Sequence, residues 1–137
     1  MTSTTISAVR PALARLNELA DLPPDWDSYG ANPPNPAAIA KAREILLELT
    51  QPLRLAGTRI EPSTIGARAD GGIMIEWGNP ETALEVHIEP DGSVGYLYED
   101  NTSRPARQVE ADDVSLTDLT PLLHDVLSSL RAHRGDG

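Results

Sequence analysis

The sequence predicts an α+β fold in which an antiparallel β-meander of at least three strands carries about three helices packed on one face. Period-2 alternation of apolar and polar residues between residues 73 and 98 indicates the strands. Turn-forming residues separate these runs, and apolar residues at helical spacing lie before and after them. The 137 residues are a usual length for one domain, residues 1–137, and can bury a core without metals or disulfides.

The N-terminal segment carries a helical stripe of apolar residues, which predicts a first helix. The stripe comprises Ile6, Val9, Leu13, Leu16 and Leu19. Pro11 obscures where regular helix begins, because proline lacks the backbone N–H that a helix interior uses. A loop rich in proline follows from Asp21 to Pro36.

A second helix is predicted after this loop, with Asn35 as its N-cap and Pro36 at its first position. Its apolar face consists of Ile39, Ala42, Ile45, Leu46 and Leu49. We expect Pro52 to end this helix, and a short strand is allowed at residues 59–61.

Three alternating segments form the predicted meander, and each would bury one face. Their apolar members are Ile73, Ile75 and Trp77, then Leu84, Val86 and Ile88, then Val94, Tyr96 and Tyr98. Gly71-Gly72 are expected to form the turn that begins the meander. The Asn79–Thr82 turn can close with Trp77 opposite Leu84.

The turn between the second and third segments sets their register. In Glu89-Pro90-Asp91-Gly92-Ser93, proline presets the first turn position and glycine can adopt the left-handed conformation. This three-residue loop places Val86 opposite Tyr96, so all the apolar residues share one face. A two-residue loop at Asp91-Gly92 would place Tyr96 opposite His87 and mix the faces.

The C-terminal part is predicted to contain a short edge strand at Val109 and a last helix. Thr120 is expected to be the N-cap of this helix, with Pro121 at the first position. The apolar face of the helix comprises Leu122, Leu123, Val126, Leu127 and Leu130. The last residues, 135–137, are expected to form a short frayed tail.

The composition of the chain excludes some kinds of site and disfavours some kinds of partner. There is no cysteine, so disulfides and thiolate metal sites are excluded, and the start of the chain lacks a signal-peptide pattern. The absence of cysteine fits a cytoplasmic protein, and no apolar run is long enough to span a membrane, so no membrane partner is expected. The net charge of −10 disfavours binding to nucleic acid. The charge either serves solubility or attracts a basic protein partner.

One candidate site is the outward face of the predicted sheet, where Glu76, Glu85, His87, Glu89 and Glu99 lie together. A histidine between two carboxylates could hold a divalent metal or act as an acid–base pair. Residues on one side of a strand are about 6.5–7 Å apart, which makes a loose frame for one ion. A solvated strand face, or a surface for a protein partner, explains the same pattern.

The second candidate site is the aromatic loop, in which Trp26, Asp27 and Tyr29 could anchor a partner. We favour a structural role, because large aromatic side chains usually stabilise a protein through buried area. In that interpretation Trp26 plugs the core between the helices, and Asp27 and Ser28 bind nearby backbone groups in an Asx-type turn.

Two motifs together resemble a widespread group of small uncharacterised bacterial proteins. These are Trp26-Asp27-Ser28-Tyr29-Gly30-Ala31-Asn32-Pro33, and Gly71-Gly72-Ile73-Met74-Ile75-Glu76-Trp77 leading to Asp91-Gly92. The group shares a W-D-x-Y-G-A-x-P loop, a G-G-x-x-x-E-W strand and a later D-G hairpin, and the resemblance covers residues 20–98. It implies an interaction role of the kind found near toxin–antitoxin or mobile genes, with no catalytic residues to transfer.

The function predicted is therefore non-enzymatic protein binding, of the antitoxin, immunity or accessory kind, with no cofactor and no metal. The candidate contact residues are Trp26, Asp27, Tyr29, Glu76, Glu85, His87 and Glu89. One alternative is a small metal-dependent or acid–base enzyme that uses Glu85, His87 and Glu89. Another is an acidic mimic of nucleic acid. The partner's identity and the oligomeric state stay open.

Overall fold

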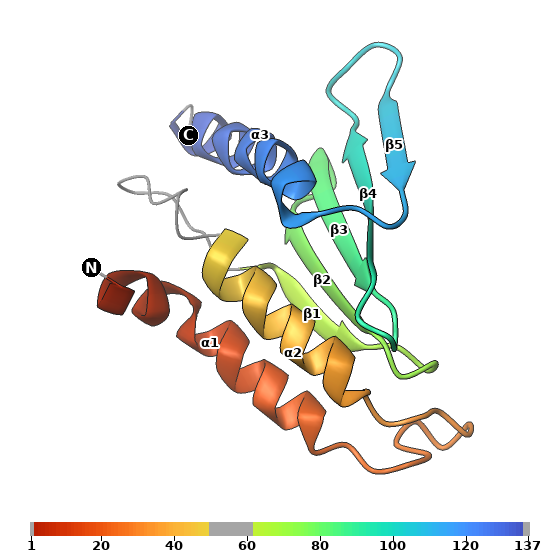
Figure 1. Ribbon diagram of the computed structural model, residues 1–137. Helices are drawn as coiled ribbons and strands as arrows, with labels where there is room; N and C mark the ends of the chain where they lie inside the picture. Colours follow the sequence, from red (N-terminus) through yellow and green to blue (C-terminus); the bar gives the residue numbers. More distant parts are fainter. Residues whose placement is uncertain (1, 50–61, 136–137) are drawn as a thin grey trace.

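A computed structural model describes residues 2–49 and 62–135 of the chain. A five-stranded sheet forms one layer, and the helices cover one of its faces (Figure 1). The elements in chain order are α1 (Thr2–Ala20), α2 (Pro36–Glu44), the π-helical turn η1 (Ile45–Leu49), β1 (Thr64–Ala67), β2 (Ile73–Gly78), β3 (Thr82–Ile88), β4 (Val94–Asp100), β5 (Arg107–Ala111) and α3 (Leu116–Gly135). No helix within the described ranges is long and apolar enough to cross a bilayer.

The sheet is an antiparallel meander in the order β1-β2-β3-β4-β5, which confirms the predicted fold class. It has two more strands than the minimum of three. Val109 lies in β5, as predicted for an edge strand. β1 was not predicted, and the strand allowed at residues 59–61 falls outside the described residues.

The predicted register is confirmed at both hairpins. Trp77 lies opposite Leu84, and Val86 lies opposite Tyr96. In the second hairpin, the N–H of Glu89 donates to the carbonyl of Ser93 at 2.8 Å, which closes the three-residue loop. Gly92 has a φ of 91°, a left-handed conformation that glycine adopts without steric cost.

The core lies between the sheet and the helices. Its sheet side is the continuous set of inward residues in β1 to β4, and the largest of these, Trp77, is fully buried. α2 contributes small residues, Ala38 and Ala42, which bring its backbone close to its neighbours. α3 packs over β2 and β3. Burial of this apolar surface is the main stabilising contribution to the fold.

The start of α2 agrees with the prediction. The Asn35 side chain accepts a hydrogen bond from the Ala37 N–H at 3.0 Å, and Pro36 occupies the first turn. The α-helical part ends at Glu44, and the chain continues through η1. Pro52, which was expected to end the helix, falls outside the described residues.

The predicted start of the last helix was wrong. α3 begins at Leu116, and Pro121 lies inside it. The N–H of Ser115 donates to Asp118 Oδ2 at 2.9 Å, which is one half of a capping box. Thr120 instead bonds back to the Leu116 carbonyl at 3.1 Å, as helix-interior threonines do. The cap is Ser115, five residues before the predicted cap Thr120, so Pro121 lies beyond the first turn.

Candidate functional site

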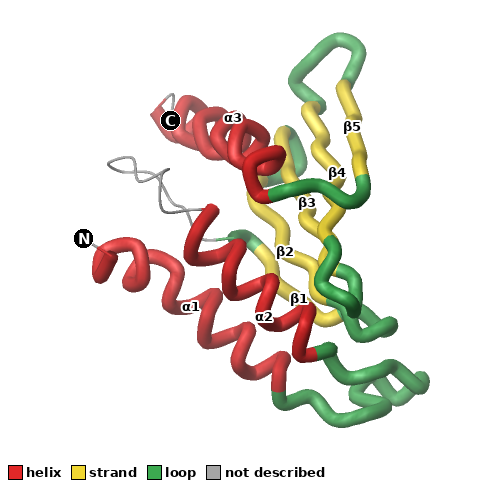
Figure 2. The backbone as a smooth tube through the Cα atoms, in the orientation of Figure 1, coloured by secondary structure: helices red, strands yellow, loops and turns green. Residues whose placement is uncertain are grey.

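The loop between α1 and α2, residues 21–35, lies at one end of the sheet (Figure 2). Two backbone hydrogen bonds fasten it to the turn between β1 and β2. The N–H of Asn32 donates to the Ala69 carbonyl at 2.9 Å, and the N–H of Asn35 donates to the Gly71 carbonyl at 2.8 Å. The loop is therefore held against the sheet at its C-terminal end.

Two aspartates organise the tip of this loop. Asp27 Oδ1 accepts hydrogen bonds from the N–H groups of Tyr29 and Ala31, at 2.9 and 3.1 Å. Asp25 Oδ1 accepts one from Gly30 at 2.6 Å. The predicted Asx-type turn at Asp27 is confirmed. Because its carboxylate binds the loop's own backbone, Asp27 shapes the site and is a poor candidate for direct partner contact.

The backbone of the same tip is strained. Asp25 and Ser28 have φ values of 61° and 66°, which non-glycine residues seldom adopt. Such conformations cost of the order of 1–3 kcal/mol each and persist only where neighbouring contacts enforce them. The hydrogen bonds to the two aspartates supply that enforcement, so the tip has a defined shape.

The prediction that Trp26 plugs the core was wrong. The side chain is only half-buried, and it does not belong to the buried cluster between sheet and helices. Its Nε1–H donates to the Asn32 carbonyl at 2.8 Å, so the indole spans the loop and closes it. The buried tryptophan of the core is Trp77. A loop has no periodicity, so the sequence could not show which way Trp26 points.

Tyr29 points away from the molecule. Its side chain is 92% exposed, whereas Tyr98 is 4% exposed and Tyr96 is half-buried. Among the side chains that the structure describes, those of residues 10–48 and 62–129, the exposed large hydrophobic ones are Tyr29 and Val109. The loop therefore holds an aromatic side chain in solvent on a backbone fixed by hydrogen bonds.

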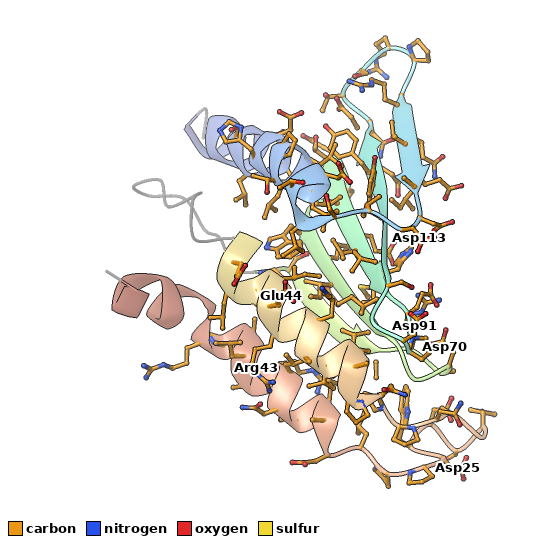
Figure 3. The ribbon with its side chains drawn as sticks, viewed as in Figure 1. Asp25, Arg43, Glu44, Asp70, Asp91 and Asp113 are labelled. Carbon is orange, nitrogen blue, oxygen red and sulfur yellow. The ribbon has the colours of Figure 1, made fainter. Side chains whose placement is uncertain are left out.

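The end of the molecule that carries this loop is acidic. Figure 3 shows Asp70 and Asp91 projecting from the two turns at this end, with Asp25 on the loop itself. The turns are adjacent, because Arg68 in one lies 3.4 Å from the Glu89 carboxylate in the other. Hydrogen bonds from the Ser93 backbone and hydroxyl lower the pKa of Asp91, so this exposed carboxyl is ionised at neutral pH.

The outward face of the sheet is the second candidate surface. The register places four glutamates on it, and no outward strand residue is Lys or Arg. These glutamates are Glu76, Glu85, Glu99 and Glu110. The predicted grouping of the first three is confirmed. Glu110 was missed, although its place next to Val109 in an edge strand implies the outward direction.

Glu76 is the most perturbed of these carboxyl groups. Partial burial, followed by the nearby charges of Glu85 and Glu99, raises its pKa above the ordinary value of 4.5. Glu76 and Glu85 are directly opposite each other on β2 and β3, where like charges repel. The face therefore holds negative charge at some cost to stability.

A hollow of about 350 Å³ lies on this face, beside the β2–β3 turn. Glu76 and Glu99 line it together with Gly78 and Ala83. The remaining lining residues are Ser63, Thr64, Asn79, Pro80 and Asn101. Several elements contribute to it, which is why no single sequence motif indicated it.

The three residues of the predicted metal or acid–base group do not converge. Glu85 Oε1 lies 3.2 Å from His87 Nε2. Glu89 instead pairs with Arg68 at 3.4 Å. Within residues 2–49 and 62–135, no three His, Asp or Glu side chains are grouped so that they could hold a metal ion. What the pair offers is an imidazole beside a carboxylate on an acidic surface.

The chain matched no protein-family model, no curated protein and no solved structure.

Proposed function

We propose that the protein is a non-enzymatic binding domain that recognises a protein partner through the loop that carries Tyr29. The observation that supports this most directly is the 92% exposure of the Tyr29 side chain. Tyrosine is enriched among the residues that dominate binding energy at protein interfaces. A loop built only to connect two helices gains nothing from holding an aromatic ring in water.

The rigidity of the loop supports the same proposal. Association costs free energy when it orders side chains and backbone, and a preformed loop lowers that cost. Here Asp25 and Asp27 bind the backbone of the tip, and the Trp26 indole closes the loop. These residues therefore act on binding by positioning Tyr29, while Tyr29 makes the contact.

The charge of the molecule favours a basic partner. The net charge is −10, and carboxylates occupy both the loop end and the outward sheet face. Complementary charge mainly raises the association rate and improves specificity, while a buried anchor residue controls dissociation. In this proposal Tyr29 supplies affinity, and Glu76 and Glu85 belong to a field that guides encounter.

An antitoxin, immunity or accessory role is the class of binding protein that we propose. It rests on the resemblance of the Trp26–Pro33 and Gly71–Trp77 motifs to the bacterial group named above. Inhibitors of this kind act by stoichiometric association and need no catalytic group. The separation of Glu89 from the Glu85–His87 pair makes the enzyme alternative the weaker one.

The test begins with affinity capture from the source organism, using immobilised wild-type protein and the Tyr29→Ala variant side by side. We expect a protein that the wild type retains and the variant loses. The Glu76→Lys, Glu85→Lys double variant is the comparison for the outward face, and it should slow association at low salt without abolishing binding. Equal capture by Tyr29→Ala and loss of capture by the double variant would move the site to the sheet face.

A further inference from the structure

β5 forms a free edge of the sheet, where backbone N–H and C=O groups can pair with another strand. β5 pairs only with β4, and no described element lies beyond it in Figure 1. Residues 107–110 are all exposed. An edge strand presents a row of backbone N–H and C=O groups that can pair with another strand.

The hydrogen bonds of the neighbouring hairpin determine which backbone groups face this edge. The N–H of Glu89 donates to the Ser93 carbonyl at 2.8 Å, and the N–H of Asn101 donates to the Glu81 carbonyl at 2.7 Å. Bonded and non-bonded pairs alternate in an antiparallel ladder. The odd-numbered residues of β4 therefore bond to β3, and the even-numbered residues of β4 bond to β5.

The β4–β5 register then shows which backbone groups of β5 bond to β4 and which face the free edge. Residues Arg107, Val109 and Ala111 lie opposite even-numbered residues of β4 and bond to them. The backbone groups of Gln108 and Glu110 consequently face the free edge. The two residues flank Val109 symmetrically.

We propose that a second copy of the chain pairs with this edge, antiparallel, about a twofold axis at Val109. The outward backbone groups of Gln108 then bond to those of Glu110 of the second copy, and the reverse pair forms by symmetry. Val109 lies opposite Val109 of the second copy in the non-bonded position between them. This is the alternation that an antiparallel ladder requires.

The side chains fit the same register. Val109 is 37% exposed and continues the inward row formed by Trp77, Leu84 and Tyr98. In a non-bonded pair the Cα atoms are about 4.5 Å apart, so the two valine side chains would cover each other. On the outward face, the Gln108 amide can donate to the Glu110 carboxylate of the second copy.

β5 also lacks two devices that block pairing at sheet edges. It contains no proline, and its register with β4 runs without a bulge over all five residues. The pairing joins the outward faces of two copies into one surface and places two Tyr29 loops on one particle. A bivalent particle binds a repeated or dimeric partner more tightly than a single copy does.

A single introduced cysteine tests the pairing, since the chain has none of its own. In Val109→Cys the two Cα atoms would be about 4.5 Å apart, within the range of a disulfide. Arg107→Cys is the matched control, because it is exposed and on the same side of the strand. Its two copies would be about 14 Å apart, four residues of strand, which is too far.

We expect light scattering across the micromolar range to give the wild type twice the 14.7 kDa mass of the chain. Mild oxidation should cross-link Val109→Cys almost completely and Arg107→Cys hardly at all. A wild type that is monomeric throughout, or equal cross-linking of the two variants, would overturn the proposal.

A backbone variant provides a second test that does not depend on position 109. Glu110→Pro removes an N–H that faces the free edge and leaves the bonds to β4 in place, whereas Glu110→Ala keeps that N–H. The proline variant should be a folded monomer and the alanine variant a dimer. A dimer in both variants would contradict the pairing.

The effect of salt separates this pairing from the proposed partner binding. Two copies that each carry −10 repel one another, so added salt should favour the dimer. Binding of a basic partner should weaken under the same change. The pairing can thus fail while the Tyr29 proposal stands, and the reverse also holds.

Discussion

Trp26 and Tyr29 lie on the same loop, but their side chains have different surroundings. The Trp26 indole is half-buried and donates to the Asn32 carbonyl, while the Tyr29 ring is almost fully in solvent. The sequence identified both as notable, because aromatic residues are rare in this chain. It could not separate them, because the direction of a loop side chain depends on backbone angles such as those of Asp25 and Ser28.

Substitutions of the two tryptophans should have unequal effects on stability. Trp77→Ala removes a fully buried side chain and should lower the free energy of unfolding by about 3–5 kcal/mol. Trp26→Phe keeps a ring and removes the bond to Asn32, so it should cost about 1 kcal/mol. Urea denaturation followed by circular dichroism measures both. Equal losses would mean that Trp26 belongs to the core after all.

The pKa of Glu76 predicts how stability changes with pH. Because folding raises this pKa, the carboxyl favours the folded state below pH 4.5 and loses that contribution as pH rises through its folded-state pKa. Glu76→Gln should therefore be more stable than the wild type at pH 7, and the difference should shrink as the pH falls towards 4.5.

The matched control for this comparison is Glu110→Gln, which changes a glutamate on the same face that lies opposite Leu97 and not opposite another carboxylate. Urea midpoints of the three proteins between neutral and acidic pH give the result. A Glu76→Gln variant that is less stable than the wild type at pH 7 would contradict the raised pKa of Glu76, which burial and the neighbouring glutamates cause together.

At the scale of elements, the strands were easier to predict than the helix ends. Alternation and the Glu89–Ser93 turn each determine which side chains point inward, and the two agree, so the hairpin register could be derived. β1 is only four residues long and contains Gly66, too short and weak a pattern to recognise. The start of α3 was misplaced because proline is common in the first turn of a helix, and the sequence alone does not show that Pro121 lies inside this one.

Substitutions at the start of α3 test the revised boundary. Asp118→Ala removes the acceptor of the Ser115 N–H and should cost about 0.5–2 kcal/mol, the usual effect of losing a helix cap. Thr120→Ala removes only a back-bond inside the helix and should leave stability nearly unchanged. Thermal or urea unfolding compares them. A larger loss for Thr120→Ala would restore the helix start that the sequence suggested.

At the scale of the whole molecule, the fold assigns different roles to its surfaces. The inward face of the sheet and the helices form the core, while the outward face carries glutamates and no Lys or Arg on its strands. The α1–α2 loop and the turns at Asp70 and Asp91 form an acidic end around an exposed tyrosine. Alternation predicted the first two surfaces. The third depends on loop contacts distant in sequence, such as that of Asn32 with Ala69.

The central claim is that Tyr29 anchors a protein partner, and the affinity of the captured partner for Tyr29 variants tests it most directly. Surface plasmon resonance should give a Kd at least about 10-fold higher for Tyr29→Ala, mainly through faster dissociation. Tyr29→Phe, which keeps the ring, should retain most of the affinity. Urea midpoints should match the wild type, because the side chain is 92% exposed. A folded Tyr29→Ala variant that binds the partner with wild-type rates would contradict the claim.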